Sequence, residues 1–166
     1  MANDEIMDSW LEAQVNDARQ LNERSDVVSV LPLDRQKYVV SFSCRGVVRS
    51  AAGEITQCDH FAVGIRFPED YLRRFNPADT IYLMSPAGTF HPNVYQSAIC
   101  VGNMVPGAGL VSLITQIHSI LSYQHMNLND PLSSEAAVWA REHLDLFPVD
   151  RRPLLRGRMS VGEEQT

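Results

Sequence analysis

The feature that most constrains the fold of this chain is a change in the spacing of its apolar residues, from helical to strand-like and back. Residues 3–24 carry apolar side chains at steps of three and four, which predicts a helix. Residues 25–84 instead show short alternating runs, and helical spacing returns at residues 109–121 and 134–146. This order of helix, antiparallel strands and C-terminal helices predicts an α+β fold.

Three strands are expected in the central region, joined as an antiparallel meander. The first presents three apolar side chains to one face: Tyr38, Val40 and Phe42. The second presents four: Phe61, Val63, Ile65 and Phe67. Residues 80–84 form the third strand, and turns are expected at Arg45-Gly46 and Ala52-Gly53. A sheet with one apolar face is therefore expected to pack against the helices.

The composition excludes two broad classes of function. The 14 basic and 20 acidic residues give a net charge of −6 at pH 7, whereas sequence-independent nucleic-acid binding needs a basic surface. No stretch approaches the roughly 20 apolar residues that span a bilayer. The 3 cysteines form no C-x-x-C pair, so neither a disulfide framework nor a zinc ribbon is expected. We therefore expect a cytoplasmic protein that binds neither nucleic acid nor membrane.

The chain is expected to form one domain. Its 166 residues can bury a single core without a metal or disulfide, and no repeat or linker divides them. We place this domain at residues 1–155. The remaining residues, 156–166, are rich in small and charged side chains and are expected to form a flexible C-terminal tail.

The least regular part of the chain, from His91 to Cys100, carries the most chemical information. Pro92 pushes His91 into an extended conformation, and Asn93 follows with an amide that can bond the backbone or a bound group. If the chain doubles back, the Cys100 thiol lies close to this amide. Such a pair suits acyl transfer, in which the thiol attacks and the amide stabilises an oxyanion. The residues alone leave open a buried structural cysteine and a simple turn.

Three segments together resemble the ubiquitin-conjugating enzyme family. They are Phe67-Pro68-Glu69-Asp70-Tyr71, then His91-Pro92-Asn93-Val94-Tyr95 with Ile99-Cys100, then Asn129-Asp130-Pro131-Leu132 with Glu135 and Ala137. The order of these segments is that of the family, and their spacing is close to the family's. The order of the expected elements extends the resemblance over residues 3–147. The resemblance implies the family's α+β architecture, called here the UBC-like fold.

The resemblance also implies a role for three residues. Cys100 would accept the C-terminal glycine of a ubiquitin-like modifier from an activating enzyme, as a thioester. Asn93 would order the active-site loop or stabilise the oxyanion, and Asp130 would orient or deprotonate the attacking lysine of a target protein. Four residues are expected to support the site: His91, Pro92, Tyr95 and Asn129. No cofactor or metal is implied for this chain, because the activating enzyme is the partner that uses ATP.

The chain departs from the family pattern around its cysteine. His91 and Cys100 lie one residue closer than usual, Val101-Gly102 replaces Leu-Asp, and Leu72 replaces a proline. Lys37 is the only lysine among the 14 basic residues. These features favour a divergent bacterial enzyme from a ubiquitin-like operon, some of which serve in phage defence. Such operons also encode a metal-dependent peptidase that removes the modifier.

Two other functions stay open. The first is an inactive binding module of the same fold, because the tryptophan usual after the cysteine is absent. The second is a cysteine hydrolase that pairs Cys100 with a histidine such as His118 or His143. A metal site is not favoured, because Cys58-Asp59-His60 lacks a second ligand pair at a useful spacing.

Overall fold

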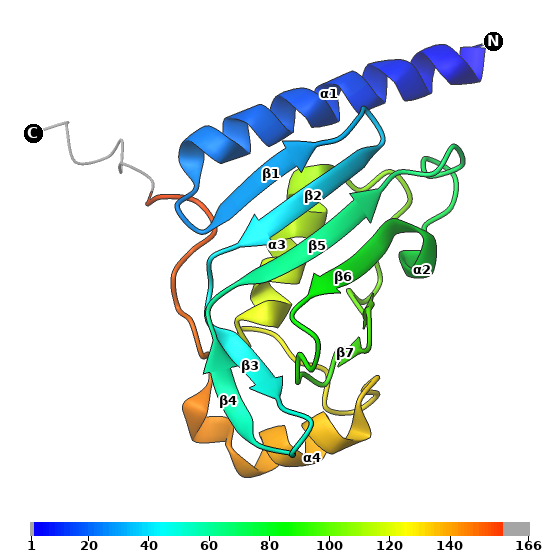
Figure 1. Ribbon diagram of the computed structural model, residues 1–166. Coiled ribbons are helices and arrows are strands. Elements are labelled where there is room, and N and C mark those ends of the chain that lie inside the picture. The colour runs from blue at the N-terminus through cyan, green and yellow to red at the C-terminus, as the bar shows by residue number, and fades with distance from the viewer. Residues whose placement is uncertain (1, 158–166) are drawn as a thin grey trace, which may run out of the picture.

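The computed structural model describes residues 2–157 (Figure 1). Its helices are α1 (Ala2–Arg24), α2 (Pro77–Thr80), α3 (Leu110–Leu121) and α4 (Ser134–Glu142), followed by a 3-10 turn, η1 (Leu144–Leu146). Its strands are β1 (Val28–Pro32), β2 (Lys37–Phe42), β3 (Gly46–Arg49), β4 (Ile55–Cys58), β5 (Phe61–Arg66), β6 (Ile81–Ser85), β7 (Val94–Tyr95) and β8 (Ala98–Ile99). The predicted α+β order is confirmed. Within the described residues, no helix is long and apolar enough to cross a bilayer.

An antiparallel sheet in the order β1-β2-β5-β6 forms the centre of the molecule. Its buried face carries the residues predicted to alternate on β2 and their cross-strand partners on β5: Tyr38, Val40, Phe42, Ile65, Val63 and Phe61. Helix α3 lies behind this face, and α1 runs beside β1 at the edge of the sheet (Figure 1). Alternation predicted the buried face correctly because a strand turns every second side chain to the same side.

The hairpin β3–β4 stands apart from the central sheet and has a small core of its own. Val47 of β3 packs in a cluster with Phe90 and Tyr123, and Trp139 and Phe147 lie against them. The rings stack closely, with 4.4 Å between the centroids of Tyr123 and Phe147. This second core joins the hairpin to α4, which is far from it in sequence.

The two glycine turns expected around this hairpin have different outcomes. The turn at Ala52-Gly53 is confirmed, and Gly53 has φ +85°, a conformation that favours glycine. The turn expected at Arg45-Gly46 is wrong, because Gly46 begins strand β3. A Cβ atom at Gly46 would lie 2.4 Å from the Phe61 ring. Glycine is therefore needed there for close packing between distant segments.

The last helix begins as predicted and ends early. The Ser133 hydroxyl accepts a hydrogen bond from the Ala136 N–H at 3.2 Å, which caps α4. The predicted end near residue 146 is wrong, because α4 stops at Glu142. The His143 ring Nδ1 lies 2.7 Å from the Trp139 carbonyl, the acceptor that a continuing α-helix would use. The chain then tightens into η1.

The segment after η1 returns to the C-terminal end of α1 and is fixed by a buried carboxylate (Figure 1). Asp150 accepts hydrogen bonds from the Arg152 guanidinium and from the Arg45 N–H, both at 2.9 Å. The hydrogen bond from Arg152 is the main cause that holds the pKa of Asp150 far below its usual range. The Arg156 N–H then donates to the Arg24 carbonyl at 2.8 Å. Residues 158–166 of the expected tail lie outside the described residues.

Candidate functional site

A short hairpin, β7–β8, brings Asn93 and Cys100 together. The Cys100 N–H donates to the Asn93 carbonyl at 2.8 Å, and the Asn93 side-chain Nδ2 donates to the Cys100 carbonyl at 3.0 Å. The chain reverses through Gln96, which has φ +53°. The structure thus places the amide beside the cysteine backbone, although the His91-to-Cys100 spacing is one residue shorter than the family's.

The Asn93 carboxamide also binds a second segment of the chain. Its Oδ1 accepts the Asn127 N–H at 2.8 Å, and the residue is only 2% exposed. Beside it, the Pro92 carbonyl accepts hydrogen bonds from the N–H groups of Leu132 and Ser133. Asn93 and Pro92 therefore tie the cysteine hairpin to the segment that precedes α4.

His91 has a structural position beneath the hairpin. Its Nδ1 accepts the Asn93 N–H at 2.8 Å, so Nε2 carries the proton and donates to the His125 carbonyl at 3.1 Å. The ring packs on Tyr123 with 4.2 Å between centroids. Burial lowers the pKa of His91 to about 3, so the ring is neutral at pH 7. These contacts orient the loop and leave neither ring nitrogen for proton transfer.

The three cysteines lie in different environments. Cys100 is partly exposed at the end of the hairpin, whereas Cys44 is fully buried. Burial raises the pKa of the Cys44 thiol to about 12 and also raises that of Cys58. Within residues 2–157, no three histidine, cysteine, aspartate or glutamate side chains gather as metal ligands. Cys58 is as half-buried as Cys100, and the two differ in that Cys58 ends strand β4 whereas Cys100 follows the hairpin β7–β8.

Asp130 and Asn129 lie on the segment that Asn93 and Pro92 hold. The Asn127 Oδ1 accepts the N–H groups of Asn129 and Asp130, each at 3.1 Å, which fixes a tight turn. Both side chains are exposed, and among residues 2–157 the Asp130 carboxylate has no hydrogen bond or ion pair. The structure therefore connects Asp130 to Asn93 through Asn127, with no direct bond to Cys100 within these residues.

Solved structures of similar shape are ubiquitin-conjugating enzyme domains. One is the E2 domain of a Toxoplasma gondii ubiquitin-conjugating enzyme, with a TM-score of 0.56 and 21% identity over 86% of this chain and 92% of that chain. Another, described as a novel ubiquitin-conjugating enzyme, has a TM-score of 0.57 and 17% identity over 84% and 88%. The fold is UBC-like. No family model matches the sequence, and no curated protein matches it.

Sequence reasoning missed one residue that organises the site of this UBC-like fold. Asn127 joins Asn93 on one side to the turn at Asn129 and Asp130 on the other. The sequence contained a signal for this turn, because an asparagine side chain often accepts the backbone N–H groups of the residues two and three positions later. Its link to Asn93 spans 34 residues and has no local signature.

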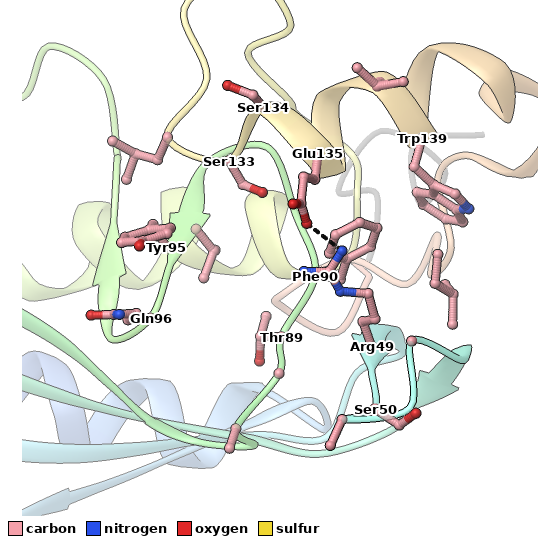
Figure 2. A pocket seen from close by; sticks show the side chains of 18 of the residues that line it. Arg49, Ser50, Thr89, Phe90, Tyr95, Gln96, Ser133, Ser134, Glu135 and Trp139 are labelled. Atoms are coloured by element: carbon pink, nitrogen blue, oxygen red, sulfur yellow. Dashed lines mark hydrogen bonds and ion pairs between the residues drawn. The ribbon is translucent and has the colours of Figure 1, made fainter.

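A groove of about 1170 Å³ also adjoins the hairpin and was not predicted (Figure 2). Its walls come from β3–β4, the segment around Thr89, the hairpin β7–β8, and α4 with the two residues before it. Arg49 crosses the groove to Glu135, with 2.5 Å between Nη1 and the carboxylate, and its guanidinium lies 4.6 Å from the Phe90 ring centroid. Tyr95, one of the expected support residues, is exposed and lines this groove.

Proposed function

We propose that this protein carries a ubiquitin-like modifier as a thioester on Cys100 and transfers it to a lysine amine of a target protein. The observation that supports this most is the half-buried Cys100 at the end of a hairpin whose backbone is held by the Asn93 carboxamide. The UBC-like fold adds support, since this hairpin occupies the irregular stretch between the sheet and α3. The modifier, an activating enzyme and the target are the partners that this function requires.

The reaction has two steps, in each of which the acyl group of the modifier moves to a new nucleophile. In the first, the Cys100 thiol attacks the thioester that joins the modifier to the activating enzyme. The modifier moves to Cys100, and the activating enzyme is released with a free thiol. In the second, a neutral lysine amine attacks the Cys100 thioester, an amide forms and Cys100 leaves with the proton from the amine. ATP is used only by the activating enzyme, so this chain needs no cofactor.

The polar residues of the site would divide the work. Asn93 holds the loop, because its two polar atoms already bond the Cys100 carbonyl and the Asn127 N–H. The exposed carboxylate of Asp130 is free to orient the incoming lysine and to take the proton of its ammonium form before the attack, which leaves the neutral amine. His91 keeps the hairpin in shape through its bond to the Asn93 N–H.

The wider setting is also part of the proposal. The scarcity of lysine and the altered residues around Cys100 favour a bacterial ubiquitin-like operon, with a deconjugating peptidase and a role in phage defence. Helix α1 exposes acidic side chains, including Glu5, Asp8 and Glu12. A partner that contacts this helix would need a basic surface.

A charging assay tests the central claim. The purified protein is mixed with ATP, the modifier and the activating enzyme from the same operon, and the products are separated with and without reductant. We expect a reductant-sensitive adduct that is lost in Cys100→Ala and kept in the matched control Cys58→Ala. A charged activating enzyme that leaves this protein unmodified would favour the inactive binding module instead.

The hydrolase alternative makes a different prediction. A Cys–His enzyme needs a histidine in contact with its nucleophile, and among residues 2–157 no histidine ring hydrogen bonds to Cys100. His118 is buried and stacks on Phe42, with 6.5 Å between ring centroids. Rapid alkylation of Cys100 at neutral pH would support a hydrolase, whereas slow alkylation supports the carrier.

A further inference from the structure

The groove contains an unpaired strand edge at Thr89. Thr89 bridges Val48 of β3, and this bridge is flanked by two hydrogen bonds of 2.8 Å, Arg49 N–H to the Gly88 carbonyl and Phe90 N–H to the Val47 carbonyl. In this antiparallel pattern, the N–H and C=O of Thr89 itself point away from β3. Among residues 2–157, no hydrogen bond engages either group. An edge of this kind is a template for another extended chain.

The walls around this edge fit the side chains of such a chain. Figure 2 shows Thr89 between Arg49 and Gln96, with the first turn of α4 across the groove. On the same side, Leu132 just before α4 and Val138 in its second turn line the groove and remain 44% and 53% exposed. A strand added at Thr89 would direct alternate side chains toward these apolar residues.

The charge of the groove favours a basic segment. Arg49 is neutralised by Glu135, and the remaining charged residue of the lining is Glu142. Asp130, also exposed, lies just before the same wall. A segment that carries a lysine complements this excess of carboxylates.

The hairpin connects the groove to the thiol. Tyr95 pairs with Ala98, and one residue beyond the last pair of the hairpin the Cys100 N–H donates to the Asn93 carbonyl. Cys100 therefore lies two residues beyond Ala98, diagonally across the hairpin from Tyr95. Diagonal neighbours on one face of a pair of strands are about 7–8 Å apart. A lysine that leaves the groove beside Tyr95 is therefore within side-chain reach of Cys100.

We propose that this groove binds an extended, lysine-containing segment of the target protein, which adds as a strand to the Thr89 edge. Its apolar side chains contact Leu132 and Val138, and its lysine passes Tyr95 toward Cys100. This inference rests on the proposed function, and it names the part of the acceptor that the protein recognises. The groove then selects targets by sequence without a separate ligase.

The test uses an array of short peptides with a central lysine and random flanking residues. Thr89→Pro removes the outward N–H and leaves the bonds of the neighbouring residues to β3 in place, whereas Thr89→Val is a matched control that keeps the N–H. We expect wild type and Thr89→Val to bind the same peptides. Thr89→Pro should bind them at least about fivefold more weakly, the value of one lost hydrogen bond. Equal binding by Thr89→Pro, or no bound peptide on the array, would overturn the proposal.

A second pair of variants leaves the backbone unchanged. Val138→Arg places a long cation in the groove, and Leu144→Arg makes the same change at a residue that is 57% exposed and outside the lining. Only Val138→Arg should lose peptide binding. Peptides that bind wild type are then offered to the charged protein, with free lysine as a second acceptor. Both groove variants should transfer to free lysine at the wild-type rate and to the peptides several-fold more slowly.

The two proposals fail separately in these experiments. If Cys100 is never charged but the peptides bind and the groove variants lose them, the carrier function is wrong and the groove is a peptide site only. If Cys100 is charged and the groove variants transfer to peptides at the wild-type rate, the groove is not the acceptor site. The carrier function would then stand without it.

Discussion

The inner and outer halves of the candidate site use their polar atoms differently. In the inner half, His91 and Asn93 are almost fully buried, and each nitrogen and oxygen of their side chains has a hydrogen-bond partner. In the outer half, Asn129 and Asp130 are exposed, and within residues 2–157 neither side chain makes a hydrogen bond. Cys100 lies at the boundary, because its backbone carbonyl bonds Asn93 of the inner half and the residue as a whole is half-buried.

This difference separates residues that set geometry from residues that are free to react. A buried polar side chain with all its partners in the chain stabilises one loop conformation, and its loss leaves those partners unsatisfied. An exposed side chain without partners contributes little to stability and is available to a substrate. Changes in the inner half should therefore appear in unfolding experiments, and changes in the outer half should appear in transfer experiments.

The largest effect is expected at the boundary, from Cys100→Ser. A serine hydroxyl forms an oxyester, so the reductant-sensitive adduct should disappear completely and any adduct that forms should resist reductant. The free energy of unfolding should change by less than about 1 kcal/mol, because the Asn93 bonds reach only the backbone of this residue. Gels with and without reductant, together with urea unfolding, measure both quantities. A large loss of stability would assign the thiol to the inner half.

The next effect is expected from Asp130→Asn. Loss of the carboxylate should slow transfer to lysine by roughly a hundredfold, the lower end of general-base contributions, while charging and stability stay unchanged. The measurement is the discharge of preloaded thioester by free lysine in single-turnover conditions. A normal discharge rate would remove Asp130 from the chemistry.

Asn93→Ala should act mainly on stability. The change leaves the Cys100 carbonyl and the Asn127 N–H without partners in a buried loop, so we expect a loss of about 2 kcal/mol in the free energy of unfolding. Urea denaturation gives this value, and discharge by lysine should slow as the hairpin loosens. If discharge falls and stability does not, Asn93 acts on the oxyanion rather than on the loop.

The sequence predicted the central sheet well because burial leaves a direct trace in the pattern. Val40 and Val63 stand opposite each other in the buried face, as alternation required. Gly46 and the early end of α4 could not be predicted in this way. The reason for Gly46 is the ring of Phe61, and the reason for the helix end is the contact of His143 with a carbonyl.

The candidate site divides along the same line. The short spacing between Asn93 and Cys100 was enough to predict that a reversal of the chain would bring them together, and the hairpin does so. The groove depends on contacts between remote segments, such as Arg49 with Glu135, which are 86 residues apart. Side chains so far apart in sequence leave no local period or motif, so only the fold reveals them.

The pH dependence of stability probes His91. Its pKa of about 3 in the folded protein lies below the ordinary value of 6.5, so the unfolded chain binds more protons between these values. Stability should therefore fall as the pH drops below 6.5, by at most about 1.4 kcal/mol per pH unit from this group. Urea unfolding at pH 7.5, 6.0 and 5.0, values we choose to bracket the unfolded pKa of about 6.5, should show a shallower dependence for His91→Gln than for wild type.

The difference between the pH profiles of wild type and His91→Gln isolates the contribution of the His91 ring. The pKa of His118 is also lowered by burial, and its contribution is present in both proteins and cancels in the difference. Parallel pH profiles would mean that the His91 ring gains its proton without loss of the loop. The inner half would then hold a protonated His91 ring, although the hydrogen bonds of this ring to Asn93 and His125 leave neither nitrogen free for a second proton.

The smallest effect is expected from Asn129→Ala, which changes the same residue type in the outer half. The N–H of Asn129, not its carboxamide, bonds Asn127, so the alanine variant keeps the turn. Stability should change by less than about 0.5 kcal/mol, against about 2 for Asn93→Ala, in parallel urea titrations. Discharge by lysine should fall only slightly, because Asp130 stays in place. A loss as large as that of Asn93→Ala would mean that the exposed carboxamide also holds the loop, and the division between the two halves would move outward to include it.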